Sequence, residues 1–451
     1  MACIEVVALV AAALACSAAR AEDRAPEAAT ACPQELPRDT RCYAGQDRNG
    51  AYYSIALPKA WNGALVIHTH GGPSLTPPSP KDPLTDLQRF NVIVAEGFAW
   101  ASSSYRHAGF GMRDAAADTD NLRQIFWAKF GRPKYTLIHG QSWGAAVAVK
   151  TSELYGLDAS GKRIYDGLIL TSGVLGGATK SYDFRADLRA VYQFYCHNLP
   201  RANEEDYPLW EGLASDSRLT RADIAARVDE CTGGASPVSS RSATQVRNLK
   251  NIVNVVHIEE RSLANHMEWA TLVFRDLVDR QLGRQNPFSN IGVIYAGSDD
   301  DAALNKGVQR FAATQAGVDG LADDADFSGR LNAPTLTLHA ERDPIAFVEL
   351  ENAFREVVVK AGYGERLMQS FTDEDEHRKE ATPEYAALLR TMIEWISTGR
   401  KPTLQSLAVS CQMAQKTYRE ACRFDPGFFP QPLTTRVYDR IRPEPRSLLL
   451  K

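Results

Sequence analysis

An alternation of strand-like and helix-like segments begins near residue 50 and constrains the fold of this chain more than any other feature of its sequence. Short apolar runs, rich in residues that favour strands, are separated by segments with helical periodicity. This alternation is typical of an α/β fold, in which helices cover the faces of a mostly parallel sheet. The runs that we interpret as strands are 52–57, 64–70, 98–105, 135–140 and 166–173.

The alternation stops after the last of these strands. Residues 182–200 and 265–283 have the pattern of amphipathic helices, and strand-like runs return only at 335–340 and 366–372. We therefore predict that a helical segment interrupts an α/β core. The expected parts are a signal peptide (1–21), a core (22–175 and 331–400), a helical cap insert (176–330) and a C-terminal strap (401–451) that lies extended on the core.

The N-terminal segment has features of an exported protein. An apolar stretch of signal-peptide length ends at Ala19-Arg20-Ala21, which fits the small-x-small cleavage pattern. Glu5 and the lack of Lys or Arg before it depart from the usual signal, and the run ALAC, which ends at Cys16, leaves a lipoprotein signal open. The apolar run is too short for a membrane anchor. We expect a secreted or periplasmic protein with no membrane span once the leader is removed.

The cysteines support export independently. Six remain after the predicted leader, in close pairs, as expected in an oxidising compartment. Proximity in the sequence favours the pairs Cys32–Cys42, Cys196–Cys231 and Cys411–Cys422, with buried free thiols as the alternative. None of the six has the spacing of a metal ligand, and the sequence predicts neither a bound metal nor a cofactor.

The composition argues against one class of partner. Hydrophobic residues make up 44% of the chain and charged residues 24%, as in an ordinary globular protein, and the net charge is -4. A protein that binds the phosphates of nucleic acid carries a basic surface instead. We therefore expect no nucleic-acid partner, and a small-molecule or polymer-derived substrate.

The motif Gly140-Gln141-Ser142-Trp143-Gly144 follows a predicted strand and opens a predicted helix. A G-x-S-x-G string is common by chance, but this place between strand and helix is that of a nucleophile elbow. The glycines are needed there because the sharp turn brings neighbouring backbone close to a serine with unfavourable dihedral angles. We predict that Ser142 is a nucleophile rather than a serine at an ordinary helix start.

A serine nucleophile needs a base, and the base needs an acid that orients it. In α/β folds that carry their serine on a nucleophile elbow, the order along the chain is serine, acid, histidine, and the acid and the histidine lie in loops after late strands. Asp343 follows the strand-like run 335–340, and His377 lies in the loop after 366–372. We predict that Asp343 and His377 complete a triad with Ser142.

Other acids and histidines fit the triad less well. Asp300 follows another strand-like run but precedes the end of the helical segment, and Glu341 points the wrong way if side chains alternate along the strand. His68 and His70 precede the serine, which is out of order for the base. The remaining histidines lie at strand ends, in the insert or before a glycine: His139, His339, His257, His266 and His107.

A loop that could stabilise an oxyanion follows an early strand. His70-Gly71-Gly72 occupies the place where lipases and esterases have an HGG-type loop. We expect one amide from Gly72 or its neighbour Gly71, because Pro73 has no N–H, and a second from Trp143. A glycine turn without a catalytic part is the alternative.

With these motifs in order, the chain resembles the α/β-hydrolase superfamily over about residues 50–175 and 331–400. HGGPS (70–74) and GQSWG (140–144) are similar to the HGGPG and GxSWG motifs of the proline iminopeptidase family, although Ser74 departs from that pattern. FAWASSSYRHAGFG (98–111) lacks the D-x-R-G-x-G-x-S run of that family and resembles secreted esterases with a YR-x-x-G turn. The resemblance implies an α/β-hydrolase fold, a Ser-His-Asp mechanism and a cap formed by the insert.

We therefore expect a serine hydrolase that cleaves carboxylic esters through an acyl-enzyme, with an aminopeptidase or amidase of the proline iminopeptidase type as the alternative. The alternative needs acidic residues that bind a substrate ammonium group, and EGLASDS (211–217) and NEEDY (203–207) are the candidates, although such runs are usually solvated surface. A binding protein with an inactive hydrolase fold is a third interpretation. Aromatic residues of the insert line a substrate pocket or form the insert's own core: Tyr192, Phe194, Tyr195, Trp210 and Trp269.

Overall fold

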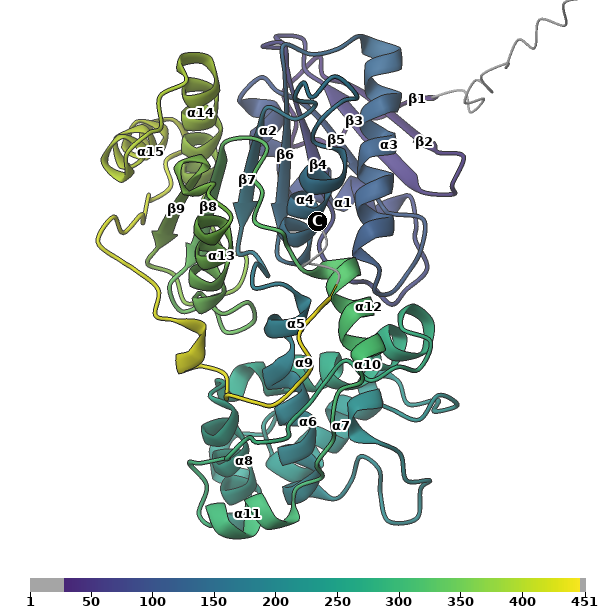
Figure 1. Ribbon diagram of the computed structural model, residues 1–451. Helices are drawn as coiled ribbons and strands as arrows, with labels where there is room; N and C mark the ends of the chain where they lie inside the picture. The colour runs from purple at the N-terminus through teal and green to yellow at the C-terminus, as the bar shows by residue number, and fades with distance from the viewer. Residues whose placement is uncertain (1–27, 447–451) are drawn as a thin grey trace, which may run out of the picture.

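The computed structural model describes residues 28–446, so the predicted signal peptide and Cys16 lie outside the described residues. Within the described part the chain forms one sheet of nine strands in the order β1-β2-β3-β5-β4-β6-β7-β8-β9 (Figure 1). The strands are β1 (Ala28–Thr30), β2 (Arg41–Gln46), β3 (Tyr52–Leu57), β4 (Ala64–Thr69), β5 (Ala99–Ser103), β6 (Tyr135–Gln141), β7 (Gly167–Thr171), β8 (Thr335–Ala340) and β9 (Leu367–Thr372).

The sheet changes from antiparallel to parallel across its width. The pairs β1–β2, β2–β3 and β3–β5 are antiparallel. The pairs β5–β4, β4–β6, β6–β7, β7–β8 and β8–β9 are parallel. Strands β4, β5, β7 and β8 are buried along their whole length, as expected for parallel strands covered on both faces. The predicted fold class is confirmed at the level of its architecture: the described chain has an α/β fold with a mostly parallel sheet.

Helices cover both faces of this sheet (Figure 1). α3, α4 and α13 pack on one face, with Val147 and Phe354 among the buried residues. α1, α2 and α14 pack on the other face, with Ile93 and Leu388 in the interior. These helices are α1 (Lys81–Arg89), α2 (Asn91–Ala95), α3 (Met112–Phe130), α4 (Trp143–Tyr155), α13 (Glu349–Lys360) and α14 (Thr382–Thr398).

The segment between β7 and β8 is helical and lies beyond one end of the sheet (Figure 1). The helix expected at 265–283 is interrupted by two π-helical turns, η4 (Trp269–Val273) and η5 (Leu277–Gln281). The strand-like run before Asp300 is not a strand, and Asp300 instead caps α11 by accepting a hydrogen bond from Ala303 N. The α-helices of the insert are α5 (Ala178–Ser181), α6 (Asp183–Cys196), α7 (Arg221–Thr232), α8 (Ala243–Val256), α9 (Leu263–Glu268), α10 (Phe274–Asp276), α11 (Asp301–Gly307) and α12 (Gln315–Ala325).

The C-terminal segment begins with a helix that the sequence analysis did not predict, α15 (Leu404–Tyr418), which packs on α14. Beyond α15 the chain crosses from the core to the insert. Phe424 forms a β-bridge with Thr372 of β9, and Ile441 N donates a hydrogen bond to Ile291 O of the insert at 2.8 Å. The tail therefore contacts both parts of the molecule.

Disulfide bonds join the six cysteines of the described chain in the predicted pairs. The Cα atoms of Cys32 and Cys42 are 5.3 Å apart, those of Cys196 and Cys231 5.5 Å, and those of Cys411 and Cys422 5.9 Å. These separations lie in the usual range for disulfides. Of the helices in residues 28–446, none combines the length and apolar character needed to cross a membrane.

Candidate active site

The turn that carries Ser142 follows β6 directly. Ser142 has a φ of 60° and a ψ of -129°, a left-handed conformation that residues with a side chain rarely adopt. Neighbouring backbone holds it there: Ser142 N donates to Thr171 O of β7 at 3.0 Å, and Ser142 O accepts from Val174 N at 3.2 Å. The hydroxyl thus stands at the carboxyl end of the parallel strands, where open α/β sheets bind their ligands.

Two glycines make this turn possible. A Cβ atom on Gly144 would lie 2.2 Å from Thr69 O, and one on Gly140 would lie 2.4 Å from Gly144 O. Both contacts are with backbone, which cannot move aside as a flexible side chain can. The glycines of the motif therefore let the start of α4 approach the end of β4.

The structure brings the other two predicted residues to Ser142. Asp343 follows β8, and His377 lies in the loop between β9 and α14. His377 Nε2 is 2.9 Å from Ser142 Oγ, and His377 Nδ1 is 2.6 Å from Asp343 Oδ2. Asp343, His377 and Ser142 thus form a continuous hydrogen-bonded chain from carboxylate to hydroxyl.

Asp343 is buried, yet its surroundings favour the ionised form. Burial opposes ionisation, but the charge of His377 and hydrogen bonds from His339 and His377 outweigh it and hold the pKa of Asp343 well below its usual range. Its second oxygen, Oδ1, accepts from the backbone N–H groups of Ile345 and Ala346 at 2.8 and 3.0 Å. The carboxylate is therefore fixed in orientation as well as in charge.

His339 supports this carboxylate from the end of β8. Its Nε2 lies 2.7 Å from Ala346 O and 3.5 Å from Asp343 Oδ2, and its Nδ1 lies 3.2 Å from Glu351 Oε1. Burial lowers the pKa of His339, but hydrogen bonds with Asp343 and Glu351 raise it to about 10. His339 was expected only as a histidine at a strand end, and in the structure it is a buried imidazolium beside Asp343.

The glycine loop after β4 lies against the elbow. Tyr105 Oη donates to His70 O at 2.9 Å and so fixes the start of the loop. A Cβ atom on Gly72 would lie 3.9 Å from the indole of Trp143, which puts the two predicted oxyanion segments in contact. Trp143 is the first residue of α4, where backbone N–H groups have no partner within the helix. Gly71, Gly72 and Trp143 thus lie together at the elbow.

A cavity of about 230 Å³ lies next to this loop. Arg89 and Arg378 line it from the core, Arg221 lines it from the insert, and the buried Asp86 accepts a hydrogen bond from His70 Nδ1 at 2.7 Å. The cavity is therefore mainly cationic. No group of three or more His, Cys, Asp or Glu side chains within residues 28–446 is arranged to hold a metal ion.

Glu380 connects the His377 loop with Gln141, which precedes Ser142, and with Ser172, which follows β7. Its carboxylate accepts hydrogen bonds from Ser172 Oγ at 2.6 Å, Gln141 Nε2 at 2.8 Å and Tyr385 Oη at 3.2 Å. Sequence analysis did not single out Glu380, because it is one of several acids in a charged loop. Its position indicates a role in holding His377 in place.

The competing acids and histidines have other surroundings. His139 is buried against His68, with their Nδ1 atoms 2.9 Å apart, and burial holds the pKa of His139 well below its usual value. Glu341 lies beside Arg342 at 3.8 Å, and His257 Nδ1 lies 3.2 Å from Arg436 O of the tail. None of these side chains is hydrogen-bonded to Ser142 in the described structure.

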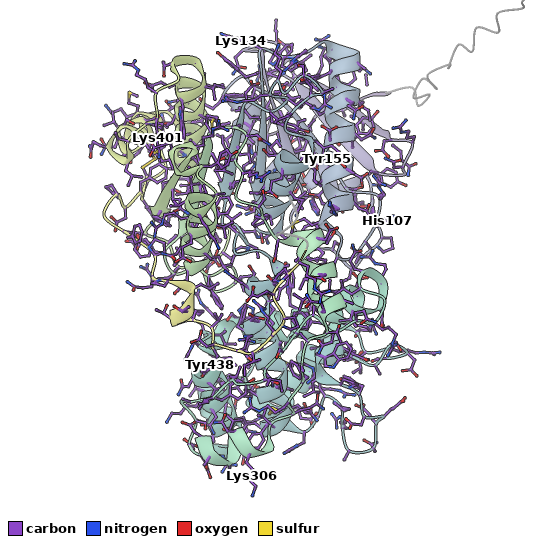
Figure 2. The ribbon with its side chains drawn as sticks, viewed as in Figure 1. His107, Lys134, Tyr155, Lys306, Lys401 and Tyr438 are labelled. Carbon is purple, nitrogen blue, oxygen red and sulfur yellow. A yellow bond between two sulfur atoms is a disulfide. The ribbon has the colours of Figure 1, made fainter. Side chains whose placement is uncertain are left out.

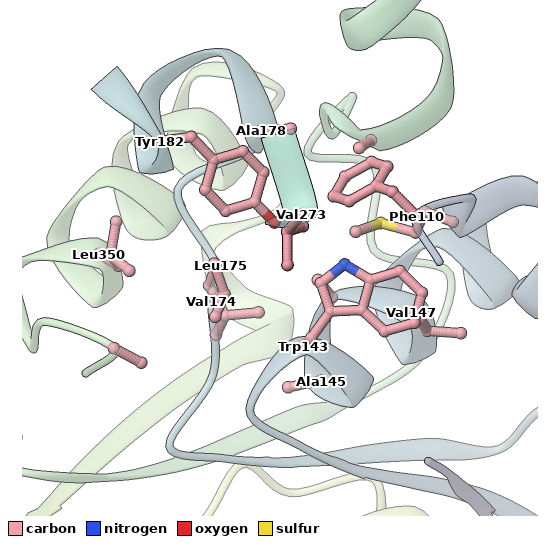
Figure 3. Packing of buried hydrophobic residues seen from close by; sticks show 14 of the residues in the cluster. Phe110, Trp143, Ala145, Val147, Val174, Leu175, Ala178, Tyr182, Val273 and Leu350 are labelled. Carbon is pink, nitrogen blue, oxygen red and sulfur yellow. The ribbon is translucent and has the colours of Figure 1, made fainter. Parts of the chain in front are cut away.

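Trp143 joins the elbow to the insert (Figure 3). Its ring centroid lies 5.9 Å from that of Phe110, which in turn lies 5.8 Å from that of Tyr182. Among the insert aromatics that the sequence suggested for a pocket, Trp269 packs on Tyr182 at 5.4 Å. Tyr192 is instead buried in the insert, where its hydroxyl donates to Asn198.

Sequence analysis also missed Arg185. Helix α6 carries four buried charged residues, Asp183, Arg185, Asp187 and Arg189. Arg440 of the tail pairs with both aspartates, and Arg189 donates to backbone carbonyls. The guanidinium of Arg185 makes no hydrogen bond or ion pair with any residue of the described chain, although the residue is only 3% exposed.

Aromatic rings surround Arg185 but do not compensate its charge. Its Cζ lies 4.6 Å from the ring centre of Trp269, 4.7 Å from Phe184 and 5.6 Å from Tyr182. Such a cation–π contact contributes about 0.5–2 kcal/mol. Removing an unpaired ion from water costs several kcal/mol. The arginine is therefore a buried cation that lacks a counter-ion among residues 28–446.

Comparisons with known proteins give structural neighbours but no family. No family model matches the chain, and no curated protein matches it. Among solved structures, an esterase from Aspergillus oryzae is similar, with 13% identity, 80% of each chain covered and a TM-score of 0.44. Feruloyl esterase B from Aspergillus oryzae is 12% identical, and the alignment covers 80% of this chain and 81% of that esterase, with a TM-score of 0.44. Tannin acyl hydrolase from Aspergillus niger has 12% identity, with 84% and 82% covered and a TM-score of 0.43.

Proposed function

We propose that this protein is a serine hydrolase that cleaves carboxylic esters, with Ser142 as nucleophile, His377 as base and Asp343 as the acid that orients the base. The observation that carries the proposal is the hydrogen-bonded chain from Asp343 Oδ2 through His377 to Ser142 Oγ, with distances of 2.6 and 2.9 Å. The strained backbone of Ser142 supports it, because such strain is concentrated at functional sites.

The reaction begins when Ser142 Oγ attacks the ester carbonyl and His377 Nε2 accepts its proton. The backbone N–H groups of Trp143 and of Gly71 or Gly72 stabilise the negative charge on the carbonyl oxygen. His377 then gives the proton to the leaving alcohol, which leaves an acyl group on Ser142. A water molecule then loses a proton to His377 as its oxygen attacks the acyl carbon. The bond between that carbon and Ser142 Oγ breaks, His377 returns the proton to Oγ, and the carboxylic acid leaves.

An amide substrate with a free ammonium group has less support. One carboxylate in each acidic run is already paired: Glu204 forms an ion pair with Arg227, and Glu211 forms one with Arg284 at 3.3 Å. Arg185, a cation, lies in the insert near the elbow, where it would repel an ammonium group. Esters without a positive charge therefore suit the site better than N-terminal peptides.

The test compares the wild type with Ser142→Ala on 4-nitrophenyl butyrate and on proline 4-nitroanilide. We expect ester turnover by the wild type, a loss of at least about 10⁴-fold in kcat in the variant, and little hydrolysis of the anilide. Circular dichroism and thermal unfolding show whether the variant keeps its fold. Undiminished ester hydrolysis by Ser142→Ala would exclude Ser142, and hydrolysis of the anilide alone would favour the amidase.

Export is part of the same proposal. The predicted signal peptide at 1–21 and the three disulfides of the described chain support it. When the full sequence is expressed in a Gram-negative host, we expect the protein in the periplasm. Its intact mass should match a chain that begins at Glu22, and its remaining cysteines should all be oxidised. Protein of full-length mass with free thiols in the cytoplasm would contradict export.

A further inference from the structure

The unpaired Arg185 lies close to the elbow that carries Ser142. The indole of Trp143, the residue after the nucleophile, faces the hydroxyl of Tyr182 (Figure 3). The guanidinium of Arg185 lies 5.6 Å from the ring of that same tyrosine. Two side-chain contacts thus separate Arg185 from the nucleophile turn.

A second series of contacts leads to Arg185 from the acid of the triad. Pro344, which follows Asp343, accepts a hydrogen bond through its carbonyl oxygen from His266 Nε2 at 2.9 Å. His266 packs on Phe184 with ring centroids 5.0 Å apart, and the Phe184 ring lies 4.7 Å from the guanidinium. The positive charge is therefore on the side of the insert that faces the triad.

The surroundings of Arg185 supply no negative charge. Burial holds the pKa of His266 well below its usual value, so this neighbour is neutral. Burial lowers the pKa of Arg185 to about 10, and Tyr182 opposes this shift only in part. Arg185 therefore stays a cation at neutral pH.

The other buried charges of α6 show how this fold treats such groups. Arg440 Nη2 lies 2.8 Å from Asp187 Oδ2, and Arg440 Nε lies 3.4 Å from Asp183 Oδ2. Arg189 Nε donates to Gly212 O at 3.2 Å. Because the other buried ions of this helix have partners, Arg185 is the position on α6 at which an anion from outside the chain would supply the missing partner.

We propose that Arg185 binds a carboxylate of the substrate, so that the preferred substrates are esters that carry a second, ionised carboxylate. A guanidinium binds a carboxylate through two parallel N–H···O hydrogen bonds. Such a pair would give Arg185 both a counter-ion and hydrogen-bond acceptors. The rings of Trp269 and Tyr182 would contact the part of the substrate between the ester and the carboxylate. This inference rests on the proposed function, because it assigns a substrate class to the same site.

The experiment measures kcat/KM for two matched pairs of esters. The 4-nitrophenyl monoesters of adipic and suberic acid carry the carboxylate, and the 4-nitrophenyl esters of the corresponding monoamides have the same shape without the charge. We expect the wild type to prefer the charged ester of at least one pair by about 10-fold or more. Arg185→Met and Arg185→Gln should bring this ratio close to one, and Arg185→Lys should keep part of it.

Two further variants separate Arg185 from other cations. Arg247→Met removes an exposed arginine of α8 and should leave the ratio as in the wild type. Arg378→Met tests the cationic cavity beside the glycine loop, and the ratio should persist there as well. Thermal unfolding of each variant, together with its turnover of the uncharged ester, shows that the site remains assembled.

The outcomes distinguish this inference from the proposed function. Equal turnover of charged and uncharged esters by the wild type would overturn the inference, whatever the variants do. A preference that persists in Arg185→Met and is lost in Arg378→Met would overturn it too, and would place the anion in the cavity. If neither ester class is hydrolysed and Ser142 reacts with no serine-directed probe, the proposed function itself fails.

Discussion

At the scale of single residues, the environment of Asp343 explains why His377 has the orientation that a base needs. Asp343 Oδ2 lies 2.6 Å from His377 Nδ1, while Oδ1 is held by two backbone N–H groups. An ionised acid accepts a hydrogen bond from Nδ1–H, which keeps the proton on Nδ1 and leaves Nε2 without one, facing Ser142. His339 adds a positive charge beside the same carboxylate.

Asp343→Asn should therefore reduce activity much more than stability. An amide keeps the shape of the side chain but no longer stabilises the protonated histidine, so we expect kcat for 4-nitrophenyl butyrate to fall by about 10³–10⁴-fold. Asp373→Asn, in the exposed loop before His377, is the matched control and should keep wild-type turnover. Retention of more than about a tenth of wild-type kcat by Asp343→Asn would contradict the role of the acid.

The three predicted triad residues could be picked out from the sequence because local rules place each of them. Ser142 is set between glycines after a strand, and Asp343 and His377 follow strands that end at the same edge of the sheet. No local rule points to Glu380 or Arg185, because their surroundings are formed by segments that lie far apart in the sequence. The one local sign of Arg185 is an arginine on the buried face of an amphipathic helix.

At the scale of elements, the elbow depends on how closely β4, β6 and α4 approach one another. The start of α4 lies so near to the end of β4 that Thr69 Oγ1 donates to Gly144 O at 2.7 Å. Any side chain at Gly144 must displace the backbone of one of these elements. The geometry of Ser142 is thus a consequence of strand and helix packing.

Gly144→Ala tests this close approach. The new methyl group would lie 2.2 Å from Thr69 O and 2.8 Å from His70 O, so we expect a loss of about 3 kcal/mol or more in the free energy of unfolding. Gly234→Ala is the control, because its nearest contact is 3.3 Å from a side-chain hydroxyl and the residue is exposed. Urea unfolding curves measure both, and equal stability of the two variants would refute the packing argument.

Elements outside the core were harder to predict. α15 begins with a capping box at Thr403 and Ser406, and its buried residues Leu407, Cys411 and Ala414 have helical spacing, so the signal was present in the sequence. The prolines that follow led us to expect an extended segment instead. The π-helical turns of the insert have no local signal, because they depend on how the helix packs against its neighbours.

At the scale of the whole molecule, the C-terminal tail holds the insert against the core. The core extends to Lys134 at one end and the insert to Lys306 at the other, and the tail at Tyr438 lies on the insert (Figure 2). Arg440, whose side chain is 4% exposed, pairs with Asp183 and Asp187 of α6. The tail thus fixes the same helix that carries Arg185.

Arg440→Ala should loosen this attachment. The change leaves the buried Asp187 without its arginine and leaves Asp183 with Arg442 as its ion-pair partner, and the loss of such a buried pair costs about 3–5 kcal/mol. We expect a clear fall in the melting temperature measured by calorimetry. Arg400→Ala, at an exposed position before α15, should change the free energy of unfolding by less than about 0.5 kcal/mol. Equal melting temperatures for the two variants would show that the tail does not stabilise the insert.

Reaction with a fluorophosphonate tests the central claim most directly, because this reagent modifies only serines that are activated as nucleophiles. Intact mass and peptide mapping should show one phosphonate group on the wild type, attached to Ser142, and none on Ser142→Ala. His377→Ala should react far more slowly, since its serine has lost the base that lies 2.9 Å away. A wild type that remains unlabelled, or that carries the label on another serine, would contradict the account.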